Sequence, residues 1–179
     1  MTEYRGSRPV VITAVFWAII STGFCLPGVV EILTARFRHN AAWGVAVSDW
    51  WSHLFLPGYN GFLLATIQAV PFVVFAVFNL FRLTRGWDAG DNVFRNRLTE
   101  AIVGLACGGS LLLWGLASIA ASSSSTSAIG YLFLPGPVSV VLIVGYFAGR
   151  CWACDVPSAR PRCPAPIPAA SRNRSPRRL

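Results

Sequence analysis

The sequence contains no lysine, only two histidines, and few charged residues of any kind. Charged side chains make up 12% of the 179 residues, against about 25% in a typical soluble domain. The longest gap covers residues 101–149, where 49 consecutive positions carry no charged side chain. A bilayer core is roughly 30 Å thick, and about 20 apolar helical residues cross it. The uncharged stretch is therefore long enough for two membrane crossings, which excludes an ordinary soluble domain.

Four apolar segments of the chain are long enough to span a bilayer. Residues 9–30 and 60–81 form the first two, and a serine-rich segment divides the long uncharged stretch into 101–121 and 128–149. The first segment exceeds the apolar stretch of a secretory signal peptide, so we expect it to be retained as a span. The sequence predicts an all-α integral membrane protein with a four-helix transmembrane domain over residues 1–150.

The fifteen basic residues are all arginine, and their distribution predicts the orientation of the chain. If the N-terminus is cytoplasmic, thirteen arginines fall on the cytoplasmic side and only Arg36 and Arg38 lie outside. Cytoplasmic segments carry such an excess, so we predict a multi-pass protein of the plasma or inner membrane with both ends in the cytoplasm. This segregation also accounts for the net charge of +8, and we expect no nucleic-acid partner.

The connection between the first two spans predicts an interfacial amphipathic helix over about residues 40–55. Helical spacing gathers apolar side chains on one face, with Ser48, Asp49 and Ser52 opposite. The apolar face consists of Trp43, Ala46, Val47, Trp50, Trp51 and Leu54. Tryptophan is favoured in the headgroup layer, so the helix would rest on lipid or serve as a lid or docking surface over the bundle.

Two small-residue motifs predict close packing between the third and fourth spans. Gly104 and Gly108 form one GxxxG motif, and Gly145 and Gly149 form the other. Such motifs let helix backbones approach closely where lipid offers no hydrophobic drive for association. Both lie near the predicted cytoplasmic side, so they would close a hairpin of spans three and four or serve a second copy of the chain.

Polar groups within the spans are few and uncharged. Ionisable side chains are missing from the central part of every span, although such groups usually mark ion pathways and proton relays. Thr66, Gln68 and Asn79 are polar residues of the second span. Gln68 either bonds a neighbouring helix or, with Asn79, lines a polar path. The only histidines, His39 and His53, lie in the outer connection, which excludes haem held between spans.

The C-terminal segment combines cysteines, prolines and arginines. Cys151, Cys154 and Cys163 are candidates for thiol chemistry or lipidation. Three cysteines without a histidine do not complete a zinc site, so we expect no metal and no cofactor. Residues 151–179 hold six prolines and six arginines, which predicts a disordered cytoplasmic tail that binds anionic lipids.

Three functional hypotheses follow from these features. The first is a non-enzymatic accessory or scaffold subunit that acts through helix–helix and loop contacts with another membrane protein or a second copy of itself. The second is a small transporter or channel with a polar path near Gln68 and Asn79. The third is a membrane enzyme that uses Cys151 and Cys154 at the inner face, or His39, His53 and Asp49 at the outer face.

Overall fold

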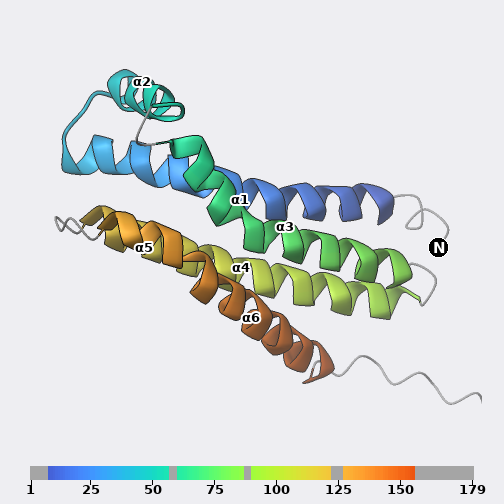
Figure 1. The fold of residues 1–179 in the computed structure, drawn as a ribbon. Helices are drawn as coiled ribbons and strands as arrows, with labels where there is room; N and C mark the ends of the chain where they lie inside the picture. The colour runs from blue at the N-terminus through green and yellow to red at the C-terminus, as the bar shows by residue number, and fades with distance from the viewer. Residues whose placement is uncertain (1–7, 57–59, 87–89, 122–126, 156–179) are drawn as a thin grey trace, which may run out of the picture.

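The computed structural model describes residues 8–56, 60–86, 90–121 and 127–155, and nearly all of them are helical. The helices run antiparallel along one bundle, with a shorter helix laid across one end (Figure 1). In chain order they are α1 (Arg8–Arg38), α2 (Trp43–His53), α3 (Gly61–Gly86), α4 (Asp91–Ala121), α5 (Ser127–Phe133) and α6 (Pro135–Asp155).

Four helical segments are long and apolar enough to cross a membrane. They are α1, α3, α4 and the stretch Ile129–Trp152, which covers most of α5 and α6. The prediction of a helical chain with four segments of spanning length is therefore confirmed. The helices extend beyond the predicted spans, because backbone hydrogen bonding continues past the apolar run. Thus α1 reaches Arg38 with Pro27 inside it, and α4 starts at Asp91.

The fourth segment differs from the continuous span expected over residues 128–149, because it is interrupted at Leu134 between α5 and α6. Pro135 has no backbone N–H and cannot bond the carbonyl of Tyr131 four residues earlier. Hydrogen bonds resume at once, since Val138 N donates to Leu134 O at 3.2 Å. Proline is well accommodated in the first turn of a helix, so α6 begins where α5 ends.

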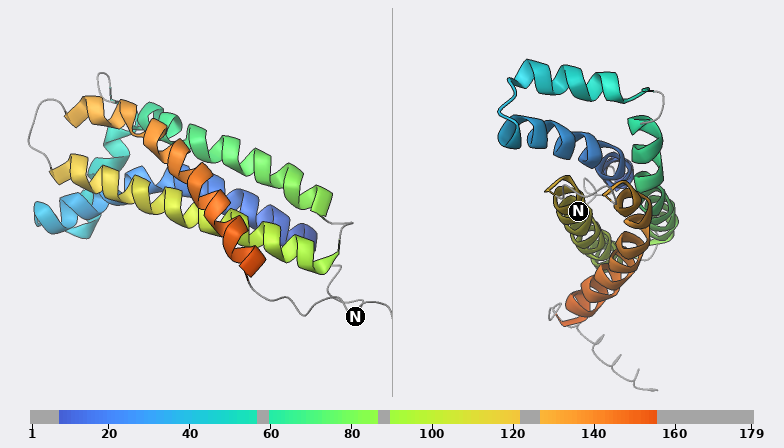
Figure 2. Two further views of the ribbon diagram at one scale, coloured as in Figure 1. Left: turned by 90° about the horizontal axis from the view of Figure 1, so that it is seen from below. Right: turned by 60° about the vertical axis from the view of Figure 1, so that its left-hand side comes forward.

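The turn from α1 to α2 depends on one residue in the left-handed region. Asn40 has φ of 53°, which asparagine tolerates better than most residues. The N–H of Ala41 donates to the carbonyl of Ala35 at 3.1 Å, and this bond closes a seven-residue loop at the end of α1. Helix α1 therefore stops sharply, and α2 returns alongside its final turns (Figure 2).

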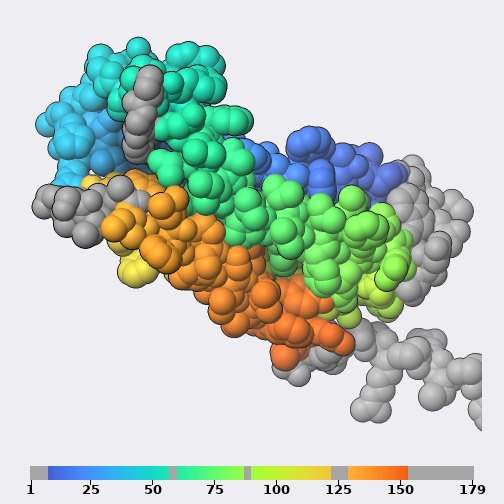
Figure 3. All heavy atoms as spheres, in the orientation of Figure 1, coloured from blue at the N-terminus to red at the C-terminus, as the bar shows by residue number. Residues whose placement is uncertain are grey.

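The bundle is built from two helix pairs. Helix α1 packs mainly on α3, and α4 packs mainly on α6. On one face of the molecule, α5 and α6 lie along α3 and cover much of α4 (Figure 3).

Glycines allow a close approach between α4 and α6. A Cβ atom added at Gly149 would lie 2.9 Å from the Cα of Glu100, and one added at Gly145 would lie 3.2 Å from the Cα of Gly104. All four glycines of the two GxxxG motifs lie at or beside this contact, since a Cβ at Gly108 would clash with the side chain of Leu142.

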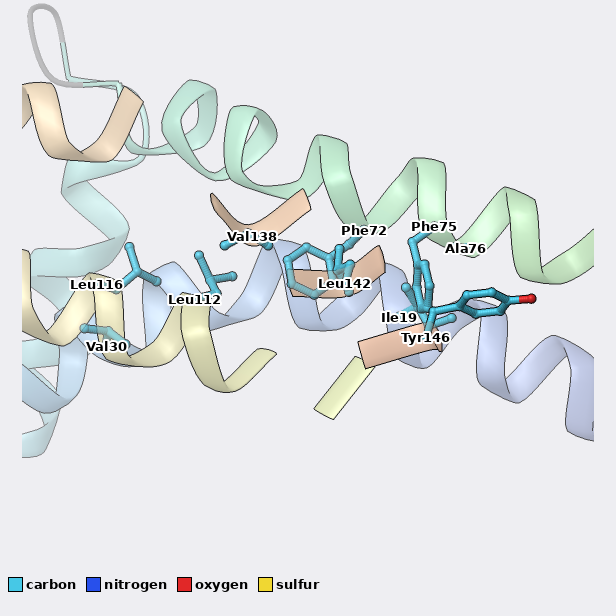
Figure 4. Packing of buried hydrophobic residues seen from close by; sticks show 10 residues of the cluster. All are labelled: Ile19, Val30, Phe72, Phe75, Ala76, Leu112, Leu116, Val138, Leu142 and Tyr146. Carbon is cyan, nitrogen blue, oxygen red and sulfur yellow. The ribbon is translucent and has the colours of Figure 1, made fainter. Parts of the chain in front are cut away.

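Apolar side chains from four helices fill the centre of the bundle. Ile19 of α1, Phe72 of α3 and Leu142 of α6 meet near its middle, and each is at most 2% exposed (Figure 4). A second cluster continues this interior to the end of the bundle where α1 and α4 begin, and it consists of Ile12 of α1, Leu83 of α3 and Phe94 of α4. The interior is thus closed by large side chains over much of its length.

Charged residues join the helices where α3 and α4 meet. Arg82 donates to Glu100 with 2.7 Å between Nη1 and Oε2, and its guanidinium lies 5.0 Å from the ring centre of Tyr146 on α6.

Arg8 of α1 pairs with Asp91 at the start of α4. At the opposite end of α1, Arg38 donates to the carbonyl of Ala120 in the last turn of α4. Arginines therefore connect α1 to both ends of α4.

The glycine contact between α4 and α6 can be tested by substitution. Gly149→Leu and Gly104→Leu should each destabilise the purified protein by about 1–3 kcal/mol, because the added side chain has no room. Thermal unfolding in detergent would measure the loss. Gly136→Leu is the matched control on α6, since a Cβ there meets nothing within 4 Å. Equal melting of all three variants and the parent would contradict the packing role.

Candidate functional site

A cavity of about 450 Å³ lies where α2 passes over the end of the bundle. Its lining comes from α1, α2, α3, α4 and α5, so it exists only when the two helix pairs and the connection between α1 and α3 have assembled. Pockets for small molecules usually measure about 300–1,000 Å³, which places this cavity within the range of a ligand site.

Helix α2 forms the roof of the cavity and is seated on α1 through small residues. Ala46 is 1% exposed, and a Cβ added at Gly28 would lie 2.6 Å from Nε1 of Trp50. The indole of Trp50 therefore occupies a notch that glycine leaves in α1. The neighbouring edge of α2 is largely uncovered: the Trp43 ring contacts Phe37 and Arg36 of α1, yet Trp43 and Trp51 are 53% and 65% exposed. The apolar face expected for this helix is thus divided between the bundle and its surroundings.

Two polar contacts tie the end of α2 to the spans. His53 Nδ1 lies 2.8 Å from Oε1 of Glu31 on α1, which makes a hydrogen bond that becomes a full ion pair when the imidazole is protonated. The N–H of Phe62 in α3 donates to the carbonyl of Leu54 at 3.0 Å. These contacts hold the roof against both α1 and α3.

Acidic and imidazole side chains gather on the α2 side of the cavity. Glu31, Asp49, His39 and His53 all contribute to its lining. The structure thus brings together the three residues that the sequence nominated for chemistry at the outer face, and adds Glu31 to them. Among the described residues, no group of three or more His, Cys, Asp or Glu side chains is arranged to hold a metal ion.

Gln68 lines the cavity from two helical turns inside α3 and is 1% exposed. Its Nε2 donates to the backbone carbonyl of Tyr131 in α5. That carbonyl is available because Pro135 cannot supply the usual helical N–H. The side chain of Gln68 therefore replaces the missing backbone donor. Its Oε1 is buried without a hydrogen-bond partner among the described residues.

The other polar residues predicted within the second span lie away from the cavity lining. Asn79 is buried and donates to the carbonyl of Phe75 at 2.8 Å, one turn back in its own helix. Thr66 bonds the carbonyl of Phe62 in the same way, also at 2.8 Å. The Asn79 amide N–H and the Thr66 hydroxyl thus both donate to carbonyls of α3 itself.

The cysteine candidates are only partly described. Helix α6 continues to Asp155, so residues 151–155 at the start of the expected tail are helical. Cys151 is exposed and not in a disulfide. Cys154 belongs to the last turn of α6, but the placement of its side chain lies outside the described part, as do Cys163 and residues 156–179.

Several residues of the site were not anticipated from the sequence. The notch at Gly28 and the pairing of Glu31 with His53 join positions that are distant along the chain. One feature of the sequence could have predicted the contact between Gln68 and Tyr131. A proline at position 135 frees the carbonyl at position 131, and the second span carries an amide able to reach it.

Comparisons of the chain with models of known protein families, with curated proteins and with solved structures find no match. The fold defines a class, a helical protein with four segments long and apolar enough to span a membrane.

The seating of α2 on Gly28 can be tested with a pair of glycine-to-alanine variants. Gly28→Ala should loosen α2, because the added methyl group occupies the space of the Trp50 indole. Hydrogen exchange of the amides in residues 43–53 should become at least about fivefold faster, the factor that corresponds to about 1 kcal/mol. Gly44→Ala is the control, since a Cβ there meets nothing within 4 Å. If the two variants exchange equally, the notch does not hold the roof.

Proposed function

We propose that this protein is a non-enzymatic accessory or scaffold subunit of a membrane assembly, acting through helix–helix and loop contacts. The observation that carries the proposal is the closed interior of the bundle below the cavity that α2 covers. In the proposed orientation this cavity faces outward, and we call it the outer cavity. Phe72 and Leu142 fill the level beneath Gln68, and both are at most 2% exposed. A solid bundle suits a protein that presents surfaces to a partner.

The surface best suited to such contacts is the uncovered edge of α2. Trp43, Val47 and Trp51 repeat every four residues, so they form one stripe along this helix, and each is at least 46% exposed. Tryptophan is enriched in protein interfaces and also in the headgroup layer of membranes. The stripe therefore offers a contact either to a neighbouring protein or to the outer leaflet, and the accessory role requires the former.

The orientation and location of the chain belong to the same proposal. Both ends lie in the cytoplasm, the membrane is the plasma or inner membrane, and the arginine-rich tail binds anionic lipids. The support is the arginine distribution, with thirteen of fifteen arginines on the cytoplasmic side of this arrangement. The antiparallel order of α1, α3, α4 and α6 is compatible with it.

Reporter fusions test the orientation. Fusions placed after Arg97 and at Leu179 should both give a cytoplasmic signal, because arginine-rich segments are retained on that side. A fusion within the outer connection, after Asn40, is the control and should report the opposite side. An external signal from either cytoplasmic position would reject the proposed topology.

A transporter remains the second candidate, and one observation favours it. Gln68 lines the outer cavity with an acceptor that has no partner in the described part of the chain, as a substrate-binding group would. The filled core and the bonding of Asn79 within its own helix are arguments against a continuous path. Solute flux into liposomes that is abolished by Gln68→Leu and preserved in Thr66→Val would establish transport and displace the accessory role.

Photo-crosslinking in native membranes tests the accessory role directly. A crosslinking amino acid at Trp51, on the exposed stripe, should yield a discrete protein adduct, either with another membrane protein or with a second copy. The same amino acid at Ser48, exposed elsewhere on α2, serves as the control. Adducts to lipid alone from Trp51, without a protein adduct, would show that α2 rests on the bilayer and would refute the proposed contact.

A further inference from the structure

We propose that the outer cavity binds a primary ammonium group carried on a small apolar body. This goes beyond the accessory role and does not depend on it, because a scaffold and a transporter would both be compatible with such a site. The inference stands on the charge of the lining, an unpartnered acceptor and the distribution of apolar side chains.

The charge of the lining favours a cation. Glu31 and Asp49 contribute carboxylates, and none of the described lining residues is an arginine or a lysine. His53 engages one oxygen of Glu31, Oε1, which leaves the second oxygen able to accept another hydrogen bond. An anionic ligand would therefore meet like charge at the α2 side of the cavity.

The Gln68 amide favours a cation that donates hydrogen bonds. A backbone carbonyl only accepts, so the amide atom facing Tyr131 O is the NH₂ group and the other atom is the oxygen acceptor. This oxygen is buried without a partner among the described residues, a state that costs free energy until a donor arrives. A primary ammonium has three N–H donors, whereas a quaternary ammonium has none.

The remainder of the lining suits an apolar body. Phe24, Leu64 and Leu116 line the cavity from three different spans, and the Trp50 ring contributes from the roof. An ammonium group within an aromatic and acidic lining gains from both charge pairing and the face of a nearby ring. A bare metal ion is the weaker candidate, because no three His, Cys, Asp or Glu side chains of the described residues are arranged to hold one.

Two kinds of molecule could bring a primary ammonium group to this cavity in a membrane. One is a free amphipathic amine that enters from outside, and the other is the ethanolamine headgroup of a phospholipid in the outer leaflet. Both present a primary ammonium next to an apolar portion. The experiment below uses a soluble amine as the probe and lipid composition to separate the two sources.

The test measures binding of 2-phenylethylamine to the full chain in phosphatidylcholine nanodiscs by titration calorimetry. The amine should bind at least about tenfold more tightly than its N,N,N-trimethyl analogue and than 2-phenylethanol, because a charged hydrogen bond to a buried acceptor contributes about that factor. Gln68→Leu should remove the preference over the trimethyl analogue. Asn79→Leu is the matched control, since it removes another buried amide from α3 without touching the cavity lining.

A second variant keeps the test decisive if Gln68→Leu fails to fold. Ala65→Phe places a ring in the cavity from a lining position and should abolish amine binding, with thermal unfolding checking that the bundle is intact. Adding phosphatidylethanolamine to the nanodiscs should weaken binding of the probe if the lipid headgroup is the natural occupant. An unchanged affinity assigns the site to a free amine.

Three results would overturn the proposal. The first is equal affinity for the amine, the trimethyl analogue and the alcohol in the parent protein. The second is a preference for the amine that Gln68→Leu leaves intact, which would place the ammonium elsewhere. The third is amine binding that persists unchanged when Ala65→Phe fills the cavity in a folded protein.

Discussion

The close approach of α4 and α6 is the contact on which the rest of the bundle depends. Lipid tails are as apolar as leucine, so helices gain little in a bilayer merely by hiding apolar surface from the solvent. They gain by packing, and Gly145 and Gly149 let the α6 backbone reach that of α4. This pair forms one wall of the interior against which α1 and α3 close. Phe72 and Leu142 can then fill the centre without leaving space between the pairs.

The cavity beneath α2 arises from two departures from regular helix. Pro135 interrupts the fourth span and frees the carbonyl of Tyr131, and Gln68 is drawn toward α5 to satisfy it. Asn40 stops α1 in a left-handed conformation, so α2 folds back and covers the space below. The cavity therefore lies where helical geometry is broken, and its polar lining reflects the backbone groups and side chains that these breaks bring together.

Much of the architecture was predictable because membrane spans are set by composition over about 20 residues. The four spanning segments and a helix within residues 40–55 followed from runs and periodicity alone. Helix ends did not, since α1 and α4 continue past the apolar residues and α5 breaks from α6 at a proline. For the site, several of the residues could be predicted from the sequence, but not their arrangement. Gln68 was predicted as a polar residue of the second span, and Asp49, His39 and His53 as a separate group. Their assembly with Glu31 around one cavity depends on how α2 sits on α1, which composition does not encode.

The arginines that join α1 to α4 have a consequence for biogenesis. Helix α1 is made first, yet Arg8 meets Asp91 and Arg38 meets the carbonyl of Ala120, both on the third spanning helix to emerge. Until α4 arrives, each guanidinium must be served by water or lipid phosphate near the membrane surface. The first helix pair can thus insert early but reaches its final contacts only when the second pair docks. Assembly of this protein is completed by its later half, because the contacts of Arg8 with Asp91 and of Arg38 with Ala120 form only after α4 has been made.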